Sequence, residues 1–230
     1  MPGRTNSSPR LYQQIAERLS QLIDKGEFKV GGRLPAEREL AKRFRVSRPT
    51  VREAIVALEI AGRIEVRVGL GVYVTAQRGA ARPALDRNEL GPFDVFQARW
   101  IIEGETAALA AKHATQADLD RIAAAFEELA ADARSKHPNA RADGRFHKLI
   151  AEASRNRALA FMVEALWEQR YRPIMKRLNE LVTSPQRRRQ NIAEHKAILD
   201  AIARGDARAA RAAMRRHIGN VFRQRLTLPR

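Results

Sequence analysis

The residues best suited to chemistry are histidines in the second half of the chain. Of the five histidines, His147, His195 and His217 each lie on an apolar stripe with helical spacing. Asp143 precedes His147 by four residues, so both side chains share one face of one helix. Imidazole and carboxylate groups are ligands for zinc, nickel or manganese. A single histidine on such a stripe is more often a core residue, so the spacing leaves a metal site and an ordinary core as alternatives.

Two further polar side chains are candidates for binding an effector beside this cluster. Arg99 is a bidentate donor that suits a carboxylate, although Glu103, four residues later, offers an ordinary salt bridge instead. Asn191 precedes His195 by one helical turn, where it either donates a hydrogen bond to a hydroxyl group or lies in solvent. A metal site with four protein ligands can still leave coordination positions for a carboxylate ligand.

A second functional candidate lies in residues 34–56, where the pattern predicts two short amphipathic helices separated by a turn. Ser47 is the predicted N-cap of the second helix, and its exposed start also carries Arg48, Thr50 and Arg52. Hydroxyl groups, arginines and free backbone N–H groups at a helix start suit a polyanion, and a braced helix of this kind can enter the major groove of DNA. Any basic helical hairpin shares these features, so the spacing alone leaves both interpretations open.

The composition bounds the class of protein. The chain has 230 residues, a formal net charge of +17 and no cysteine. The charge suits a polyanionic partner, and the lack of cysteine excludes disulfides, cysteine-ligated zinc fingers and thiol catalysis. The start of the chain has no apolar signal segment, and no stretch reaches the roughly 18 apolar residues of a membrane span. We therefore expect a soluble cytoplasmic protein with no membrane partner.

The periodicity divides the chain into regions. Residues 1–9 have no apolar pattern and are expected to be disordered, whereas 10–76 are typical of three helices and a two-stranded hairpin, a winged helix-turn-helix. Residues 77–92 form a predicted linker with Gly and Pro breaks. Residues 93–230 predict an all-α bundle of about six helices, with Pro173 kinking or splitting the fourth. The expected fold class is therefore mainly α.

Several ordered motifs resemble a known family. The motifs lie at residues 12–15, 34–41, 46–54, 69–74, 93–99, 143–147, 154–156, 194–199 and 214–217. Those in the first half resemble the GntR family of bacterial transcription regulators. Those in the second half resemble the FCD ligand-sensing domain of its FadR branch. A weaker resemblance, at residues 162–170 and Pro173, is to the regulators that respond to hexuronates and related sugar acids.

The resemblance implies roles for the basic residues of the first half. In the family, residues that match Arg38, Arg48 and Arg52 contact phosphates or guanine edges, and hydroxyl groups such as those of Ser47 and Thr50 assist. The wing departs from the family pattern because Val68 and Leu70 stand where polar or basic residues are common. Wing contacts would therefore come from the Gly69 backbone and Arg67. Arg63 also stands where an apolar residue is usual in the family, and the sequence gives no reason for it.

The resemblance also implies roles in the second half. The FCD metal motif of one aspartate and three histidines is complete, and it assigns zinc, with nickel or manganese as alternatives, to Asp143, His147, His195 and His217. Trp167 and Arg170 are candidates for the pocket lining, although a tryptophan in a bundle helix is more often part of the core.

We predict a homodimeric regulator, specifically a repressor, that is not an enzyme. A C2 dimer would bind a near-palindromic operator in double-stranded DNA, and a small carboxylate such as a sugar acid would modulate that binding. Two alternatives remain. One is a metal-dependent hydrolase with a DNA-binding appendage, because an Asp/His₃ site can also activate water. The other is an architectural DNA-binding dimer without an effector.

Overall fold

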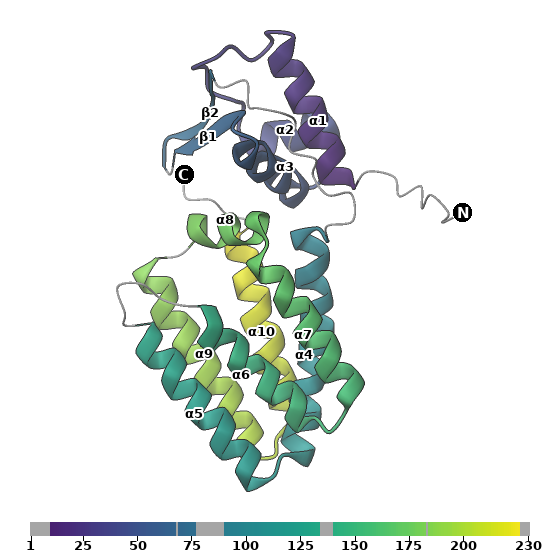
Figure 1. Ribbon diagram of the computed structural model, residues 1–230, viewed down its shortest axis with the longest axis vertical. Helices are drawn as coiled ribbons and strands as arrows, with labels where there is room; N and C mark the ends of the chain where they lie inside the picture. Colours follow the sequence, from purple (N-terminus) through teal and green to yellow (C-terminus); the bar gives the residue numbers. More distant parts are fainter. Residues whose placement is uncertain (1–9, 68, 77–89, 134–139, 183, 226–230) are drawn as a thin grey trace, which may run out of the picture. The chain divides into compact units, whose positions relative to one another are not determined.

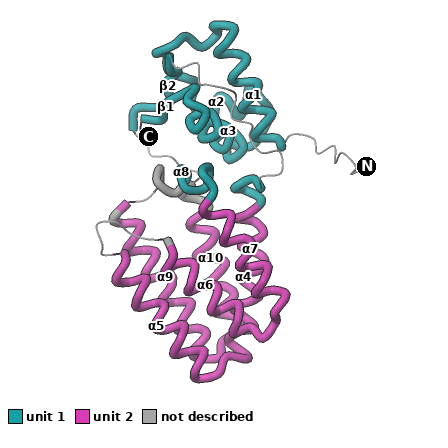
Figure 2. Tube along the Cα trace, in the orientation of Figure 1, with its two compact units in different colours: residues 1–94, 172–182, 224–230 teal, residues 95–171, 183–223 magenta. Residues whose placement is uncertain are grey.

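The computed structural model describes residues 10–67, 69–76, 90–133, 140–182 and 184–225. The predicted disordered tail (1–9) and most of the predicted linker (77–89) lie outside the described residues. The chain divides into two compact units (Figure 2): residues 1–94, 172–182 and 224–230 form one, and residues 95–171 and 183–223 form the other. None of the described helices is long and apolar enough to cross a membrane.

The first unit contains three helices ahead of its sheet (Figure 1). They are α1 (Leu11–Asp24), α2 (Glu37–Phe44) and α3 (Arg48–Ile60). α3 packs against both α1 and α2, and this contact buries Leu19, Leu40 and Val51 completely. Ser47 is the N-cap of α3, as the sequence predicts, because its hydroxyl accepts a hydrogen bond from the Thr50 N–H at 3.3 Å.

The wing is a two-stranded antiparallel sheet. β1 (Ile64–Arg67) pairs with β2 (Gly71–Val74), and Ile64 lies opposite Val74. Gly69 and Gly71, with φ of 77° and 123°, supply the positive φ that the connection requires. Arg63 has a structural explanation, because its guanidinium forms an ion pair with Asp24 of α1 at 2.5 Å. It therefore ties the base of the wing to the first helix.

One helix from the second half of the sequence belongs to the first unit. α8 (Pro173–Val182) packs against α3, and Arg177 forms an ion pair with Glu59 near the end of α3 at 2.7 Å. The same carboxylate accepts a hydrogen bond from the Val66 N–H of β1 at 3.0 Å. Glu59 therefore connects α3, α8 and the wing.

The second unit is a helical bundle. It contains α4 (Pro92–His113) from Val95 onward, α5 (Gln116–Asp132), α6 (Ala140–Ala153), α7 (Arg157–Glu168), the 3₁₀ turn η1 (Gln169–Tyr171), α9 (Pro185–Ala203) and α10 (Ala207–Arg225) as far as Arg223. α6 packs between α5 and α7, and Phe146, Ile150 and Ile198 are completely buried. The expected fold class is confirmed. Pro173 does split the fourth predicted helix, because a proline fits the first turn of a new helix but not a helix interior.

Candidate metal and effector site

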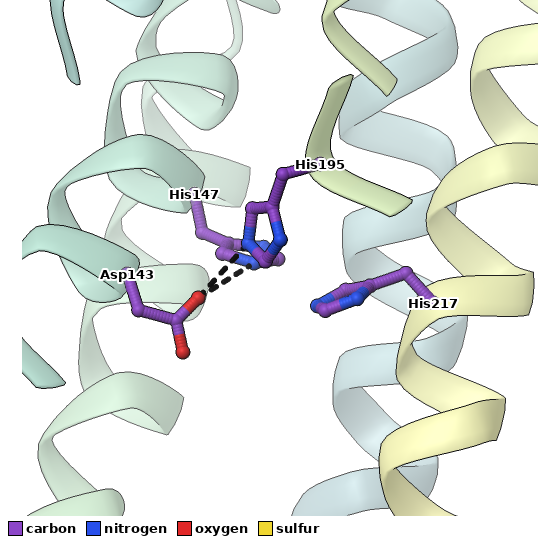
Figure 3. A group of neighbouring side chains, drawn as sticks. All are labelled: Asp143, His147, His195 and His217. Atoms are coloured by element: carbon purple, nitrogen blue, oxygen red, sulfur yellow. Dashed lines mark hydrogen bonds and ion pairs between the residues drawn. The ribbon is translucent and has the colours of Figure 1, made fainter. Parts of the chain in front are cut away.

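The candidate metal ligands come together in the core of the bundle. α6 carries Asp143 and His147 one turn apart, α9 carries His195, and α10 carries His217. One ligand atom from each lies within 4.8 Å of the others, and Figure 3 shows the four side chains pointing toward one another. Two ligand atoms on one tetrahedral zinc ion, with bonds of ~2.0–2.2 Å, lie ~3.3–3.6 Å apart. The cluster would therefore bind a divalent ion after its widest ligand pairs close by about 1 Å.

The hydrogen bonds within the cluster favour a cation at its centre. His195 lies between two acceptors, with Nδ1 2.7 Å from the Asn191 carbonyl oxygen and Nε2 3.0 Å from Asp143 Oδ1. A neutral imidazole has only one N–H and can donate to only one of these acceptors, so a metal ion bound between Nε2 and Asp143 would satisfy the other side. His147 Nε2 is enclosed and has no hydrogen-bond partner among the described residues. A buried nitrogen of this kind points to a ligand.

The other two histidines are oriented by carboxylates through their Nδ1 atoms. His147 Nδ1 donates to Glu103 of α4, and His217 Nδ1 donates to Glu194 of α9 at 2.9 Å. An acceptor at Nδ1 holds the tautomer whose Nε2 lone pair is available to a metal. When neutral, each of these two rings therefore offers its Nε2 lone pair to a metal ion.

Arginines keep the carboxylates of the site ionised. Burial alone raises the pKa of Glu103, but the charges of Arg99 and His147 outweigh it and bring that pKa to about 2. Burial is likewise outweighed at Asp143, where Arg170 and the histidines hold the pKa well below its usual range. Both groups are thus negative at neutral pH, as a cation site requires.

The third carboxylate sits beside a neutral histidine. Burial, followed by the charge of His195, lowers the pKa of His217 to about 3, so the ring is uncharged near pH 7. At Glu194, burial is outweighed by hydrogen bonds from His217, Arg187 and Asn220, which bring the pKa to about 2. A neutral imidazole backed by an anionic carboxylate is a strong donor to a metal ion.

A buried arginine (Arg99), a half-buried arginine (Arg170) and a tryptophan adjoin the cluster. Arg99 pairs with Glu103 at 2.5 Å, and Arg170 pairs with Asp143 at 2.8 Å. Their guanidinium carbons lie 4.1 Å and 4.8 Å from the centre of the Trp167 ring. Trp167 Nε1 and Arg170 Nε are enclosed and have no hydrogen-bond partner among the described residues. Guanidinium groups and unpaired N–H donors suit an anionic ligand rich in oxygen atoms.

Sequence patterns do not reveal all of these contacts. Local spacing does offer the salt bridge between Arg99 and Glu103, and the structure contains it. The contact of Glu194 with His217 joins α9 to α10, so no spacing along one helix signals it. The effector contact of the Asn191 side chain stays a prediction. The contact that the structure shows for Asn191 is made by its backbone carbonyl, which accepts a hydrogen bond from His195 Nδ1 one helical turn later.

Most of the predicted DNA-binding residues lie at the surface of the first unit. Arg38 on α2, Arg48 at the start of α3 and Gly69 in the wing are exposed. Thr50 is half-buried, with its hydroxyl 2.8 Å from that of Ser47. The start of α3 thus presents the positive charge of Arg48 beside the hydroxyl groups of Ser47 and Thr50, an arrangement that suits phosphates.

Arg52 lies in a different environment from the other predicted DNA contacts. Its side chain is 2 % exposed, and its guanidinium pairs with Glu37 of α2, with Nε 2.7 Å from the carboxylate. Position 52 faces α2 rather than solvent, so Arg52 braces the two helices and could reach DNA only by opening this pair. Arg45 lies in the turn between α2 and α3 with a φ of 56°, and it is a further exposed cation that no sequence motif indicates.

Comparison with known proteins gives matches along most of the chain. Residues 11–74 match the bacterial regulatory proteins of the gntR family, and residues 94–220 match the FCD domain. The Exu regulon transcriptional regulator of Escherichia coli (strain K12) is 40% identical, over 92% of this chain and 83% of that protein. The Uxu operon transcriptional regulator of the same strain is 37% identical, over 96% and 88%. Among solved structures, Streptococcus agalactiae GntR is 28% identical with a TM-score of 0.50, over 92% and 99%.

Proposed function

Because the chain belongs to the GntR family of bacterial regulatory proteins and carries an FCD domain, it is a transcription regulator and not an enzyme, and we propose that it is a metal-containing repressor whose effector is a sugar acid. The proposed regulator is a cytoplasmic homodimer on a near-palindromic operator, because a two-fold protein matches a two-fold DNA site. The hydrolase alternative is set aside, since the matched domains and relatives are those of regulators.

The observation that carries the proposal is that the cluster of one aspartate and three histidines lies beside Arg99 and Arg170. Asp143 and the three histidines would hold a divalent ion, with zinc the first candidate. When bound, such an ion supplies a Lewis-acid position for an oxygen atom of the effector. The Arg99 guanidinium would donate hydrogen bonds to the carboxylate of the effector. Trp167 Nε1, which has no hydrogen-bond partner among the described residues, would donate to one of its hydroxyl groups.

A hexuronate is the effector that this chemistry favours. It combines one carboxylate with several hydroxyl groups and so matches a site that contains both guanidinium groups and N–H donors. The sequence resemblance to hexuronate-responsive regulators supports the same class. Two relatives named for the Exu regulon and the Uxu operon support it as well.

Thermal unfolding of the zinc-loaded full chain tests the proposal. We expect D-galacturonate or D-glucuronate to raise the stability by roughly 2.7 kcal/mol at about 100 times the dissociation constant, whereas galactose, which lacks the carboxylate, has no effect. His195→Ala should abolish the shift because it removes a ligand of the cluster. His113→Ala is the matched control, since His113 is an exposed histidine at the end of α4.

A DNA measurement then tests the sense of regulation. A duplex selected in vitro by the zinc-loaded protein serves as the operator, and fluorescence anisotropy measures its affinity with and without the acid. Release of the duplex by the acid that stabilises the protein supports the repressor. An acid that binds and leaves the duplex affinity unchanged, or tightens it, contradicts induction. The architectural dimer would be favoured if neither acids nor chelation changed melting or DNA binding.

A further inference from the structure

Glu103 is a buried carboxylate whose two oxygen atoms have different partners. It lies on α4 with 1 % exposure, and Oε1 accepts a hydrogen bond from Arg99 Nε at 2.5 Å. Oε2 accepts a hydrogen bond from His147 Nδ1, across to α6. Both donors are themselves buried, so neither contact is weakened by solvent. One carboxylate thus holds a candidate metal ligand with one oxygen and a candidate effector arginine with the other.

The contact to His147 determines which ring nitrogen faces the cluster. Because an ionised carboxylate only accepts hydrogen bonds, the proton of a neutral His147 must sit on Nδ1. Nε2 then carries the lone pair, and it is the enclosed nitrogen without a partner among the described residues, 3.6 Å from Asp143. The carboxylate also makes the imidazole a stronger donor to a metal ion.

The contact to Arg99 leaves the far side of the guanidinium available. Arg99 uses Nε for Glu103, and its guanidinium carbon lies 4.1 Å from the centre of the Trp167 ring. Within the part of the chain that the structure describes, neither Nη atom of Arg99 donates a hydrogen bond. Two parallel N–H groups at this end form the fork that binds a carboxylate with two hydrogen bonds.

We propose that Glu103 is a shared positioning residue that aligns His147 for the metal ion and Arg99 for the effector carboxylate. This inference rests on the proposed function for the identity of the metal ion and the acid. Its consequence is specific: loss of one carboxylate lowers the affinities for zinc and for the acid together. The two effects have separate physical routes, since His147 contacts one oxygen and Arg99 the other.

The test compares Glu103→Gln with Glu105→Gln in the full chain. Glu105 lies on the same helix and also pairs with arginines, Arg211 and Arg215, but its side chain is 41 % exposed and it contacts no histidine among the described residues. Zinc affinity is measured by competition with a chromophoric chelator. We expect Glu103→Gln to weaken it about tenfold, because the amide keeps an acceptor for His147 but loses the charge, and Glu105→Gln to leave it unchanged.

The second measurement is D-galacturonate affinity by calorimetry at saturating zinc, which removes the metal effect. We expect Glu103→Gln to weaken binding because Arg99 is no longer held in place, and Arg99→Gln to weaken it without weakening zinc. If wild type binds the acid and Glu103→Gln binds it equally well, or if zinc affinity is unchanged, the shared role is wrong. If zinc-loaded wild type binds no hexuronate, the proposed effector is wrong, and so is the proposal that Glu103 aligns Arg99 for it. The zinc affinity of Glu103→Gln still tests whether Glu103 aligns His147 for the metal ion.

A spectroscopic readout on wild type needs no variant and therefore cannot fail through misfolding. Long-range ¹H–¹⁵N correlation spectra of the zinc-free protein, at alkaline pH where imidazole is neutral, report which nitrogen of His147 carries the proton. A proton on Nδ1 supports the positioning role. A proton on Nε2 overturns it, because Glu103 would then have no donor to hold.

Discussion

The winged unit and the bundle keep their functional charges in opposite environments. In the winged unit Arg38 and Arg48 are exposed, so their charge is directed outward and is available to a polyanion. In the bundle His195 is completely buried and Glu103 almost so, and each forms a hydrogen bond with a neighbour from another turn or helix. A surface site can be built from residues that are close together in the sequence. A buried site also needs polar partners from other helices for its buried charges, and the positions of those partners depend on the tertiary structure.

Arg52 is a residue of the winged unit whose environment resembles that of the buried charges in the bundle. It is a buried cation with a carboxylate partner, Glu37. Arg52→Ala leaves that carboxylate unpaired and should lower the free energy of unfolding of the winged unit by about 3 kcal/mol, whereas Arg48→Ala should change it by less than about 0.5 kcal/mol. Urea unfolding monitored by circular dichroism measures both. Equal, small effects would mean that Arg52 is as solvent-accessible as Arg48 in solution.

Glu53 gives the winged unit a pH dependence. It is buried on α3, where its carboxylate accepts the Phe93 N–H at 2.5 Å, and burial, with the nearby charge of Asp94, raises its pKa to about 7. Between pH 4.5 and 7 the folded state therefore binds more protons than the unfolded state. The contribution of Glu53 is fully present below pH 4.5 and falls as pH rises through 7, by at most about 3 kcal/mol.

Glu53→Gln tests this sign directly. The amide cannot titrate, so the stability of wild type relative to the variant should fall from pH 5 to pH 8 in thermal unfolding at constant salt. All other ionisable groups are the same in both proteins, so their contribution cancels in the difference. Parallel stability curves for the two proteins would contradict a raised pKa at Glu53.

A substitution of Arg48 tests whether the exposed charges of the winged unit bind DNA. Arg48→Ala should weaken binding to all duplexes by a similar factor and reduce the slope of log affinity against log salt by about 1, because one phosphate contact is lost. Anisotropy titrations on a selected and a scrambled duplex, over a range of salt concentrations, measure the slope. A loss confined to the selected duplex would instead assign Arg48 to a base edge.

The ease of prediction follows the same division. The helices of the winged unit are predictable because Ser47 caps α3 and the apolar stripes of α1 to α3 repeat at helical spacing. The four cluster residues are predictable as candidates because each lies on the inward face of its own helix. Two features are not predictable in this way. Arg52 lies on the inward face of α3 although its type and position suggest an exposed contact, and Arg170 reaches Asp143 from η1, a turn with no helical periodicity.

The sequence by itself determined the family, the mainly α fold class, and the residue types available for chemistry. These follow from periodicity and motif spacing, which act over a few turns of chain. Only the tertiary structure decided which carboxylate orients which histidine, which arginine neutralises it, and which arginine of the winged unit is buried. The physical reason is that hydrogen bonds and ion pairs in a core join residues far apart in sequence, such as Glu103 with His147 and Asp143 with His195, through helix packing that no local pattern encodes.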